Sequence, residues 1–229
     1  MILLVTESPF FFSTILGVLE YMPRFLIKNG TLLTQNPTRE ICRKDILVEN
    51  GVIAEIKEHL LIDGEIIYAT GKYIIPGFIQ PHLHVGLPAF EKSDETKSST
   101  DLLKIISEQS SESVRMSAEI NCKLLWEGGT TTFLGMEHPL YPDAVFQTIH
   151  RSGLRAMVGN GWIDHGDAFP QIQMTMEELI TQSQKLIRKW HLSENGRLRY
   201  LLCPGSIPLC SGQSWREIAE ISNRDQPCV

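Results

Sequence analysis

Paired cysteines, basic stretches and long hydrophobic runs are all scarce in this sequence. The formal net charge is −6 and no basic stripe is present, so nucleic acid is not expected as a partner. The absence of any Cys-x-x-Cys pair argues against a disulfide framework and favours a reducing, cytoplasmic compartment. The cysteines are scattered at Cys42, Cys122, Cys203, Cys210 and Cys228.

The apolar stretch at residues 10–19 lacks the properties of a targeting or membrane segment. No Lys or Arg precedes Arg24, whereas a secretory signal begins with a basic region. The stretch is also shorter than the roughly 20 residues that a membrane span needs. We therefore expect residues 1–21 to be a non-native or disordered extension, with Met22 as the natural start and no membrane partner. A cryptic signal or membrane anchor is the alternative interpretation.

Residues 22–75 have the pattern of short strands joined by tight turns. Asn29-Gly30 and Asn50-Gly51 each separate two apolar runs. Asn-Gly between such runs is typical of a two-residue hairpin, because a type I′ turn needs positive φ at both central residues. We therefore predict a hairpin at each of these positions and a further strand over residues 65–69.

From residue 76 onward the pattern alternates between strands and helices. Strand followed by helix, four times over, predicts parallel strands with helical crossovers. A complete (β/α)8 barrel takes about 250 residues, so this region predicts the α/β fold of a partial (β/α)8 barrel with about four βα units. The predicted strands cover residues 73–85, 130–134, 154–158 and 197–203, and the predicted helices cover residues 101–126, 142–152, 175–190 and 214–221.

His82 and His84 stand at the end of the first of these strands. Residues two apart on a strand point to the same face, about 6.6 Å apart along the chain, so both imidazoles can bind one ion. Spacing alone is weak evidence, because a bare His-x-His pair also occurs by chance. Zinc and iron both accept imidazole nitrogen, so the ligand type does not choose between these two metals.

Four segments follow one another along the chain: Pro76-Gly-Phe-Ile-Gln-Pro-His-Leu-His84, Gly128-Gly-Thr-Thr-Thr-Phe133, Ser152-Gly-Leu-Arg-Ala156 and Asp164-His-Gly-Asp167. The first resembles the first barrel strand of the amidohydrolase superfamily, and all four follow in the order typical of the branch of cytosine, guanine and S-adenosylhomocysteine deaminases and triazine hydrolases. Within that branch, three further segments resemble the 5′-deoxyadenosine deaminase type: Ile187-Arg-Lys-Trp-His191, Asn195-Gly-Arg197 and Cys203-Pro204. The resemblance implies one divalent metal, Zn or Fe.

The resemblance implies a domain organisation and an activity. Residues 22–75 would be the N-terminal part of a β-sandwich domain, and residues 76–229 the first half of a metal-dependent hydrolase barrel. The activity implied is hydrolytic deamination of a purine, nucleoside or other amino-heterocycle at a divalent metal ligated by His82 and His84. The family's remaining ligands and its acid–base glutamate come from later barrel strands, so no catalytic residue is expected within this chain.

Residues that follow the later strands are candidates for substrate contacts, because the active site of such a barrel lies at the carboxyl ends of its strands. Glu137 and His138 follow the second strand, and Trp162 follows the third, where it could stack on a purine ring. Each has a plain structural alternative. The Glu137–His138 pair would be a solvated loop, and Trp162 would be a packed core residue.

Two other interpretations remain open. A half barrel exposes two strand edges, so the chain is alternatively a non-catalytic truncated fragment that needs a partner chain or forms a homo-oligomer. A cyclic-amide hydrolase is the other alternative. Such enzymes usually carry Asp two residues before the first histidine, where this chain has Gln80, and they use a bridging lysine that has no obvious counterpart here.

Overall fold

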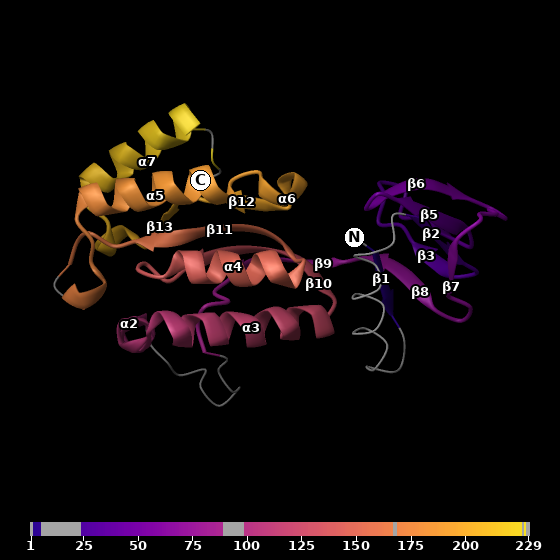
Figure 1. The fold of residues 1–229 in the computed structure, drawn as a ribbon, viewed down its shortest axis with the longest axis horizontal. Helices are drawn as coiled ribbons and strands as arrows, with labels where there is room; N and C mark the ends of the chain where they lie inside the picture. The colour runs from indigo at the N-terminus through magenta and orange to yellow at the C-terminus, as the bar shows by residue number, and fades with distance from the viewer. Residues whose placement is uncertain (1, 6–23, 89–98, 167–168, 226, 228–229) are drawn as a thin grey trace. The chain divides into compact units, whose positions relative to one another are not determined.

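The structure, a computed structural model, describes residues 2–5, 24–88, 99–166, 169–225 and 227 (Figure 1). The chain divides into two compact units. Residues 1–78 and 126–131 form the first unit, and residues 79–125 and 132–229 form the second. None of the described helices is both long enough and apolar enough to cross a membrane.

The first unit consists of two four-stranded sheets around one apolar core. Its short strands confirm the prediction of small sheets ahead of the α/β region. One sheet has the order β1 (Ile2–Val5), β8 (Tyr73–Pro76), β3 (Thr31–Leu33) and β4 (Ile41–Cys42). The other has the order β6 (Val52–Lys57), β5 (Asp45–Glu49), β2 (Arg24–Lys28) and β7 (Glu65–Tyr68). The core residues come from both sheets: Phe25, Ile27, Leu32, Ile46, Val48, Ala69 and Ile74.

Of the segment predicted as an extension, residues 1–21, only β1 lies within the described residues, where it pairs antiparallel with β8. The prediction for the rest of that segment falls outside the described residues.

The two Asn-Gly sequences have different roles. Asn50 and Gly51 have φ values of 50° and 78° and join the antiparallel strands β5 and β6, so this hairpin is confirmed. The hairpin predicted at Asn29-Gly30 is wrong, because β2 pairs with β5 and β7 whereas β3 pairs with β4 and β8. A Cβ at Gly30 would lie 2.4 Å from Cδ1 of Ile74, so close core packing is what requires glycine there.

The second unit is built on a sheet with the order β12-β11-β10-β9, and β13 also pairs with β11. The pairs that β11 makes with β10, β12 and β13 are all parallel, which confirms the predicted α/β class. The predicted fourth strand is split into β12 and β13. Between them the carbonyl of Leu201 approaches the backbone of Gly159 so closely that a Cβ there would lie 1.7 Å from its oxygen. The strands are β9 (Phe78–Leu83), β10 (Thr130–Glu137), β11 (Arg155–Trp162), β12 (Leu198–Tyr200) and β13 (Cys203–Pro204).

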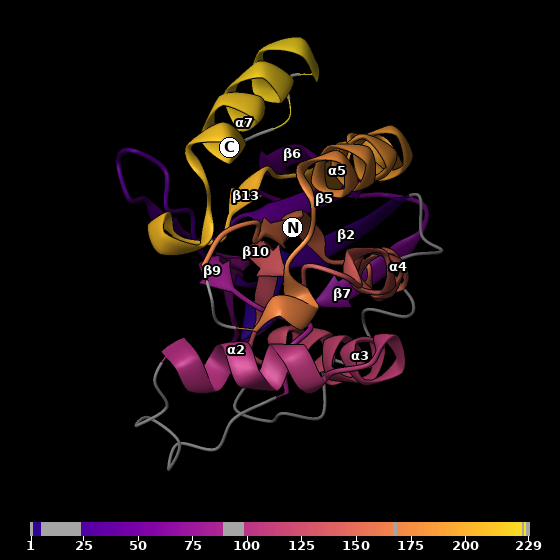
Figure 2. The same cartoon turned by 90° about the vertical axis from the view of Figure 1, so that its left-hand side faces the viewer.

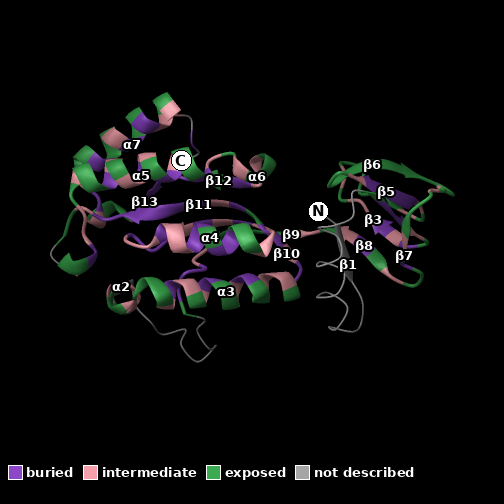
Figure 3. Ribbon diagram, viewed as in Figure 1, coloured by how far each residue is buried: buried purple, intermediate pink, exposed green. Residues whose placement is uncertain are grey.

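Helices α3, α4 and α5 follow one another along one side of this sheet (Figures 1 and 2). Burial is concentrated in β10, β11 and the helix faces turned toward them (Figure 3). The helices are α2 (Ser99–Glu108), α3 (Ser111–Glu127), α4 (Pro142–Ser152), α5 (Met176–Trp190), α6 (Ser193–Gly196) and α7 (Gly212–Asp225), with short 3-10 turns η3 (Pro170–Ile172) and η4 (Ile207–Leu209). The helical region predicted over 101–126 is therefore broken between α2 and α3.

Helix α5 begins as its sequence predicts. The side chain of Thr175 accepts a hydrogen bond from the backbone N–H of Glu178, and the Glu178 side chain accepts one from the backbone N–H of Thr175. This reciprocal capping box satisfies two donors that the first helical turn otherwise leaves without partners. Leu179, Ser183 and Leu186 then recur at helical spacing on the buried face.

We expect Thr175→Ala to lower the free energy of unfolding by about 1 kcal/mol, because it removes the N-cap acceptor. Urea denaturation followed by circular dichroism would measure the change. Thr181→Ala is the matched control, since Thr181 is exposed in the middle of the same helix and alanine is a better helix former. Equal effects of the two substitutions would contradict a capping role.

Candidate functional site

The two histidines at the end of β9 have a geometry that suits one metal ion. Their ring centroids are 5.1 Å apart and their planes are inclined by 84°. Two imidazoles bound to one zinc at about 2.0–2.1 Å, at a roughly tetrahedral angle, have ring centroids about 5 Å apart. The side chains of His82 and His84 therefore fit a divalent metal by both donor type and spacing.

The ring of His84 is oriented by the neighbouring strand. Its Nδ1 is within hydrogen-bonding distance of the backbone carbonyl oxygen of Met136 in β10. A carbonyl only accepts, so Nδ1 carries the proton and Nε2 keeps a free lone pair. Burial lowers the pKa of His84, while the Met136 carbonyl raises it and the nearby His82 lowers it, and the net shift is downward. Neutral imidazole is the form that binds metal, and metal-bound histidines commonly donate their second N–H in this way.

The histidine pair does not by itself make a catalytic metal site. Within the described residues, no group of three or more His, Cys, Asp or Glu side chains is placed to hold a metal ion. Catalytic zinc typically has three protein ligands and an open position. The two histidines would thus need at least one further ligand to make a catalytic centre.

Glu137, the last residue of β10, is 4% exposed and directed at the backbone that follows His84. Its Oε1 accepts the N–H of Val85 at 2.9 Å, and its Oε2 accepts the N–H of Gly86 at 2.8 Å. Burial raises the pKa of Glu137 to about 8, against the lowering effect of the hydrogen bonds from Gly86 and Val85. Both carboxylate oxygens are therefore engaged by this chain's own backbone.

The other two candidate substrate contacts also bond within the fold. His138 is buried, its Nε2 donates to the carbonyl of Ile106 at 2.8 Å, and its Nδ1 accepts the N–H of Leu140 at 3.1 Å. The indole of Trp162 is fully buried, and its N–H donates to the hydroxyl of Ser183 at 3.0 Å. The assignment of Glu137, His138 and Trp162 to substrate binding stays a prediction.

A buried polar network connects β11 and β12 with α5. The hydroxyl of Tyr200 lies 2.7 Å from Oδ1 of Asn160 and 2.8 Å from the hydroxyl of Ser183. The amide of Asn160 donates to Gln182 at 2.7 Å. Because buried polar groups are costly without partners, this network ties the helix to one position on the sheet.

Asp164 connects the loop after β11 with the start of α7. Its Oδ1 accepts from the backbone N–H of Ser211 at 2.9 Å and from the hydroxyl of Ser214 at 2.7 Å, and its Oδ2 accepts from the hydroxyl of Ser211 at 2.6 Å. Burial alone would raise the pKa of Asp164, but the hydrogen bonds from Ser211 and Ser214 outweigh it and lower the pKa.

Asn121 and Gln109 belong to none of the motifs from which the sequence predicts a function. Both donate hydrogen bonds to backbone carbonyls of the turn that follows His84. A signal existed for Asn121, since it follows Val114 by seven residues and Ala118 by three, which places a polar side chain next to the buried face of α3. Gln109, between two helices, carried no comparable signal.

The sequence profile of the amidohydrolase family matches residues 73–224. A relative from Bacillus cereus (strain AH187), named 5-methylthioadenosine/S-adenosylhomocysteine deaminase, is 26% identical over 213 residues, covering 88% of this chain and 48% of the relative.

Two solved structures show the same fold at low identity. Triazine hydrolase from Arthobacter aurescens superposes with a TM-score of 0.78 at 17% identity, covering 90% of this chain and 51% of that one. Guanine deaminase from E. coli superposes with a TM-score of 0.74 at 23% identity, covering 89% and 50%. The chain spans about half the length of the relatives it matches.

We expect His84 to be the Nδ1–H tautomer at neutral pH, because the Met136 carbonyl can only accept. Long-range ¹H–¹⁵N correlation spectra distinguish the two tautomers by the nitrogen shifts, and His84→Gln would assign the signals. Added zinc should shift Nε2 of His84 and leave Nδ1 protonated. Protonation at Nε2 instead would contradict the orientation described above.

Asp164→Asn should lower the free energy of unfolding by about 1.5 kcal/mol at pH 7, because charged acceptors make stronger hydrogen bonds. The pKa of Asp164 is lower in the folded chain than its ordinary value of 3.8, so its stabilisation is present above that pH. This stabilisation is lost as the pH falls through the folded pKa, so the difference in free energy of unfolding between Asp164→Asn and wild type should shrink at low pH. Urea unfolding between pH 7 and pH 3 measures this difference, and Asp63→Asn, at an exposed position, is the control.

Proposed function

Because the chain belongs to the amidohydrolase family, we propose that it contributes His82 and His84 to a metal-dependent site for hydrolytic deamination of an amino-heterocycle. The observation that supports this most directly is the 5.1 Å separation of the two imidazole rings, one of which has its Nδ1 bonded to Met136. The substrate class proposed is a purine or nucleoside, in line with the name of the Bacillus cereus relative. The activity is proposed for a protein that also contains the remaining barrel strands.

The metal, zinc or iron, would when bound lower the pKa of water and supply a nucleophile near neutral pH. The part of this chain is to hold two neutral imidazoles at the carboxyl end of the sheet. We propose that Glu137, His138 and Trp162 shape the substrate side of the site from the ends of β10 and β11. We also propose that the protein is a cytoplasmic enzyme that acts on a small molecule and has no nucleic acid or membrane partner.

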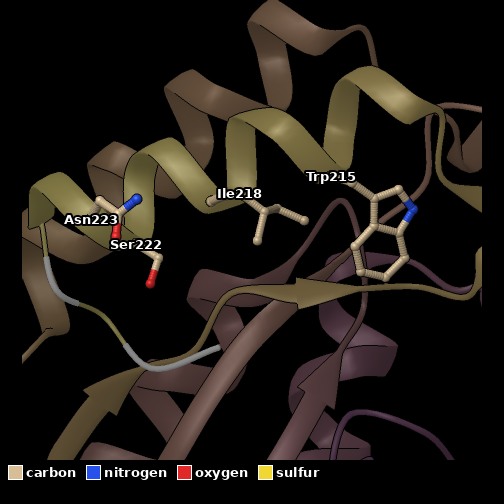
Figure 4. Close-up of a pocket in the computed structure, with 5 residues that line it drawn as sticks. Trp215, Ile218, Ser222 and Asn223 are labelled. Atoms are coloured by element: carbon tan, nitrogen blue, oxygen red, sulfur yellow. The ribbon is translucent and has the colours of Figure 1, made fainter.

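A second candidate function is association with another polypeptide, without catalysis by this chain. It is favoured by a groove along α7, lined by Trp215, Ile218, Ala219, Ser222 and Asn223, with Trp215 41% exposed. Trp215 and Ile218 project from the same side of α7 (Figure 4). The next βα unit of a barrel packs beside the fourth, so we assign the groove to the remaining βα units, on this polypeptide or on another.

Ammonia release tests the deaminase proposal. We would express the reading frame as it continues past the codon for Val229 and supply 5-methylthioadenosine, S-adenosylhomocysteine or guanine with zinc or ferrous iron. His82→Gln and His84→Gln should each lower kcat/KM by at least about 100-fold, because each removes a direct metal ligand. His59→Gln, at an exposed position in the first unit, should leave the rate unchanged.

Ring opening without ammonia would replace the deaminase proposal with a cyclic-amide hydrolase. A frame that ends at Val229, together with an inactive chain, would favour the second candidate. Sedimentation velocity would then detect a complex that Trp215→Glu weakens, because a charge would be placed in the apolar groove.

A further inference from the structure

The turn that follows the histidine pair has a partner for every backbone N–H. The N–H groups of Val85 and Gly86 donate to the two oxygens of Glu137, at 2.9 and 2.8 Å. The N–H of Leu87 donates to the carbonyl of His84 at 3.3 Å. A single carboxylate that spans two successive amides limits the rotation of both peptide groups.

The carbonyls of the same turn are bonded by side chains from the helical side. The Nδ2 of Asn121 in α3 donates to the carbonyl of Val85 at 2.8 Å and to that of Leu87 at 2.7 Å. The Nε2 of Gln109, between α2 and α3, donates to the carbonyl of Gly86 at 2.9 Å. All three carbonyls of the turn are thus bonded by two amide side chains that are distant in sequence.

Gln109 contains a buried atom that is unfavourable for the stability of the fold. Its Oε1 is the one buried side-chain polar atom without a hydrogen-bond partner among the described residues. A buried acceptor without a partner is unfavourable, so an apolar side chain of similar size would suit packing better. The favourable interaction that offsets this is the hydrogen bond from Nε2 of Gln109 to the carbonyl of Gly86.

The packing of Gly86 shows how closely the turn is held. A Cβ at this position would lie 3.0 Å from Oε2 of Glu137, 3.1 Å from Val114 and 3.2 Å from Val145. Any side chain here would force the carboxylate or the two valines to shift by a few tenths of an ångström. The strand, two helices and the carboxylate therefore enclose the turn.

The same end of β10 also orients His84. Met136 accepts from Nδ1 of the imidazole, and the adjacent Glu137 holds the two residues that follow His84. The ring and the backbone after it are consequently set by two neighbouring residues of one strand. Metal-binding side chains that are ordered in advance lose less entropy when the ion binds.

We propose that Glu137, Asn121 and Gln109 are positioning residues of the metal site, holding the Val85–Leu87 turn so that His82 and His84 converge before a divalent cation binds. The inference rests on the proposed function of the histidine pair. It adds Asn121 and Gln109 to the residues that support the site. It also gives Glu137 a role that acts through the backbone amides of Val85 and Gly86.

Zinc affinity of the full 229-residue chain tests the proposal, measured by competition with a chromophoric chelator. Glu137→Gln replaces one acceptor oxygen with an NH₂ group that faces a backbone N–H. Asn121→Asp replaces a donor with an acceptor that faces two carbonyls. Each should weaken zinc binding by about 10–100-fold. Asn121→Asp is the sharper variant, because its added negative charge would by itself favour a cation.

Two controls separate positioning from general stability. Glu108→Gln makes the same chemical change at an exposed position next to Gln109 and should leave zinc affinity unchanged. Tyr200→Phe removes a hydroxyl from the buried network on α5, so it should lower the thermal unfolding temperature without weakening zinc binding. Hydrogen exchange at the amides of Val85 and Gly86 should speed up only in the Glu137 and Asn121 variants.

The double variant His82→Gln/His84→Gln distinguishes failure of this inference from failure of the proposed function. If it removes zinc binding while Glu137→Gln and Asn121→Asp bind zinc as wild type does, the positioning role is overturned and the metal site stands. If the double variant itself binds zinc as wild type does, the proposed metal site fails and the positioning role fails with it.

Discussion

The hydrogen bonds between the ends of β9 and β10 are the constraint on which the candidate site depends. A backbone carbonyl of β10 accepts a hydrogen bond from Nδ1–H of His84, and the side chain of the next residue accepts hydrogen bonds from the two amides after His84. These contacts fix the tautomer of one imidazole and the path of the chain after it. A free strand end would have to be ordered by the metal itself, at an entropic cost that lowers affinity.

The parallel sheet makes this arrangement possible. Parallel pairing of β10 with β11, and of β11 with β12 and β13, brings the carboxyl ends of successive strands to one edge. The polar network of Tyr200, Asn160 and Ser183 then ties α5 to the sheet, while Asp164 ties the loop after β11 to α7. The ends of the strands are thus rigid where the chemistry of this family takes place.

The share of its relatives that the chain covers and the number of candidate metal ligands it contains are consistent with each other. The chain corresponds to about half of the deaminase from Bacillus cereus and of both solved neighbours, and two histidines are fewer than the three protein ligands of a typical catalytic zinc. The groove along α7 lies on the fourth unit, where a completed barrel adds its fifth. The proposed function is therefore assigned to a protein that also contains the remaining βα units.

The sequence by itself determined the elements whose signals are local. The sequence predicted a helix starting at residue 175, a hairpin at Asn50-Gly51 and, from the alternation of strands and helices, parallel pairing. These signals are local, because capping, turn geometry and periodicity depend on neighbours along the chain. Tertiary structure decided the rest. Asn29-Gly30 joins strands of two different sheets and Ile74 packs closely against Gly30, while Asn121 and Gln109 bond carbonyls 36 and 23 residues away. Helical spacing can place Asn121 beside the buried face of α3, but the partners of such long-range hydrogen bonds are set only once strands and helices have packed.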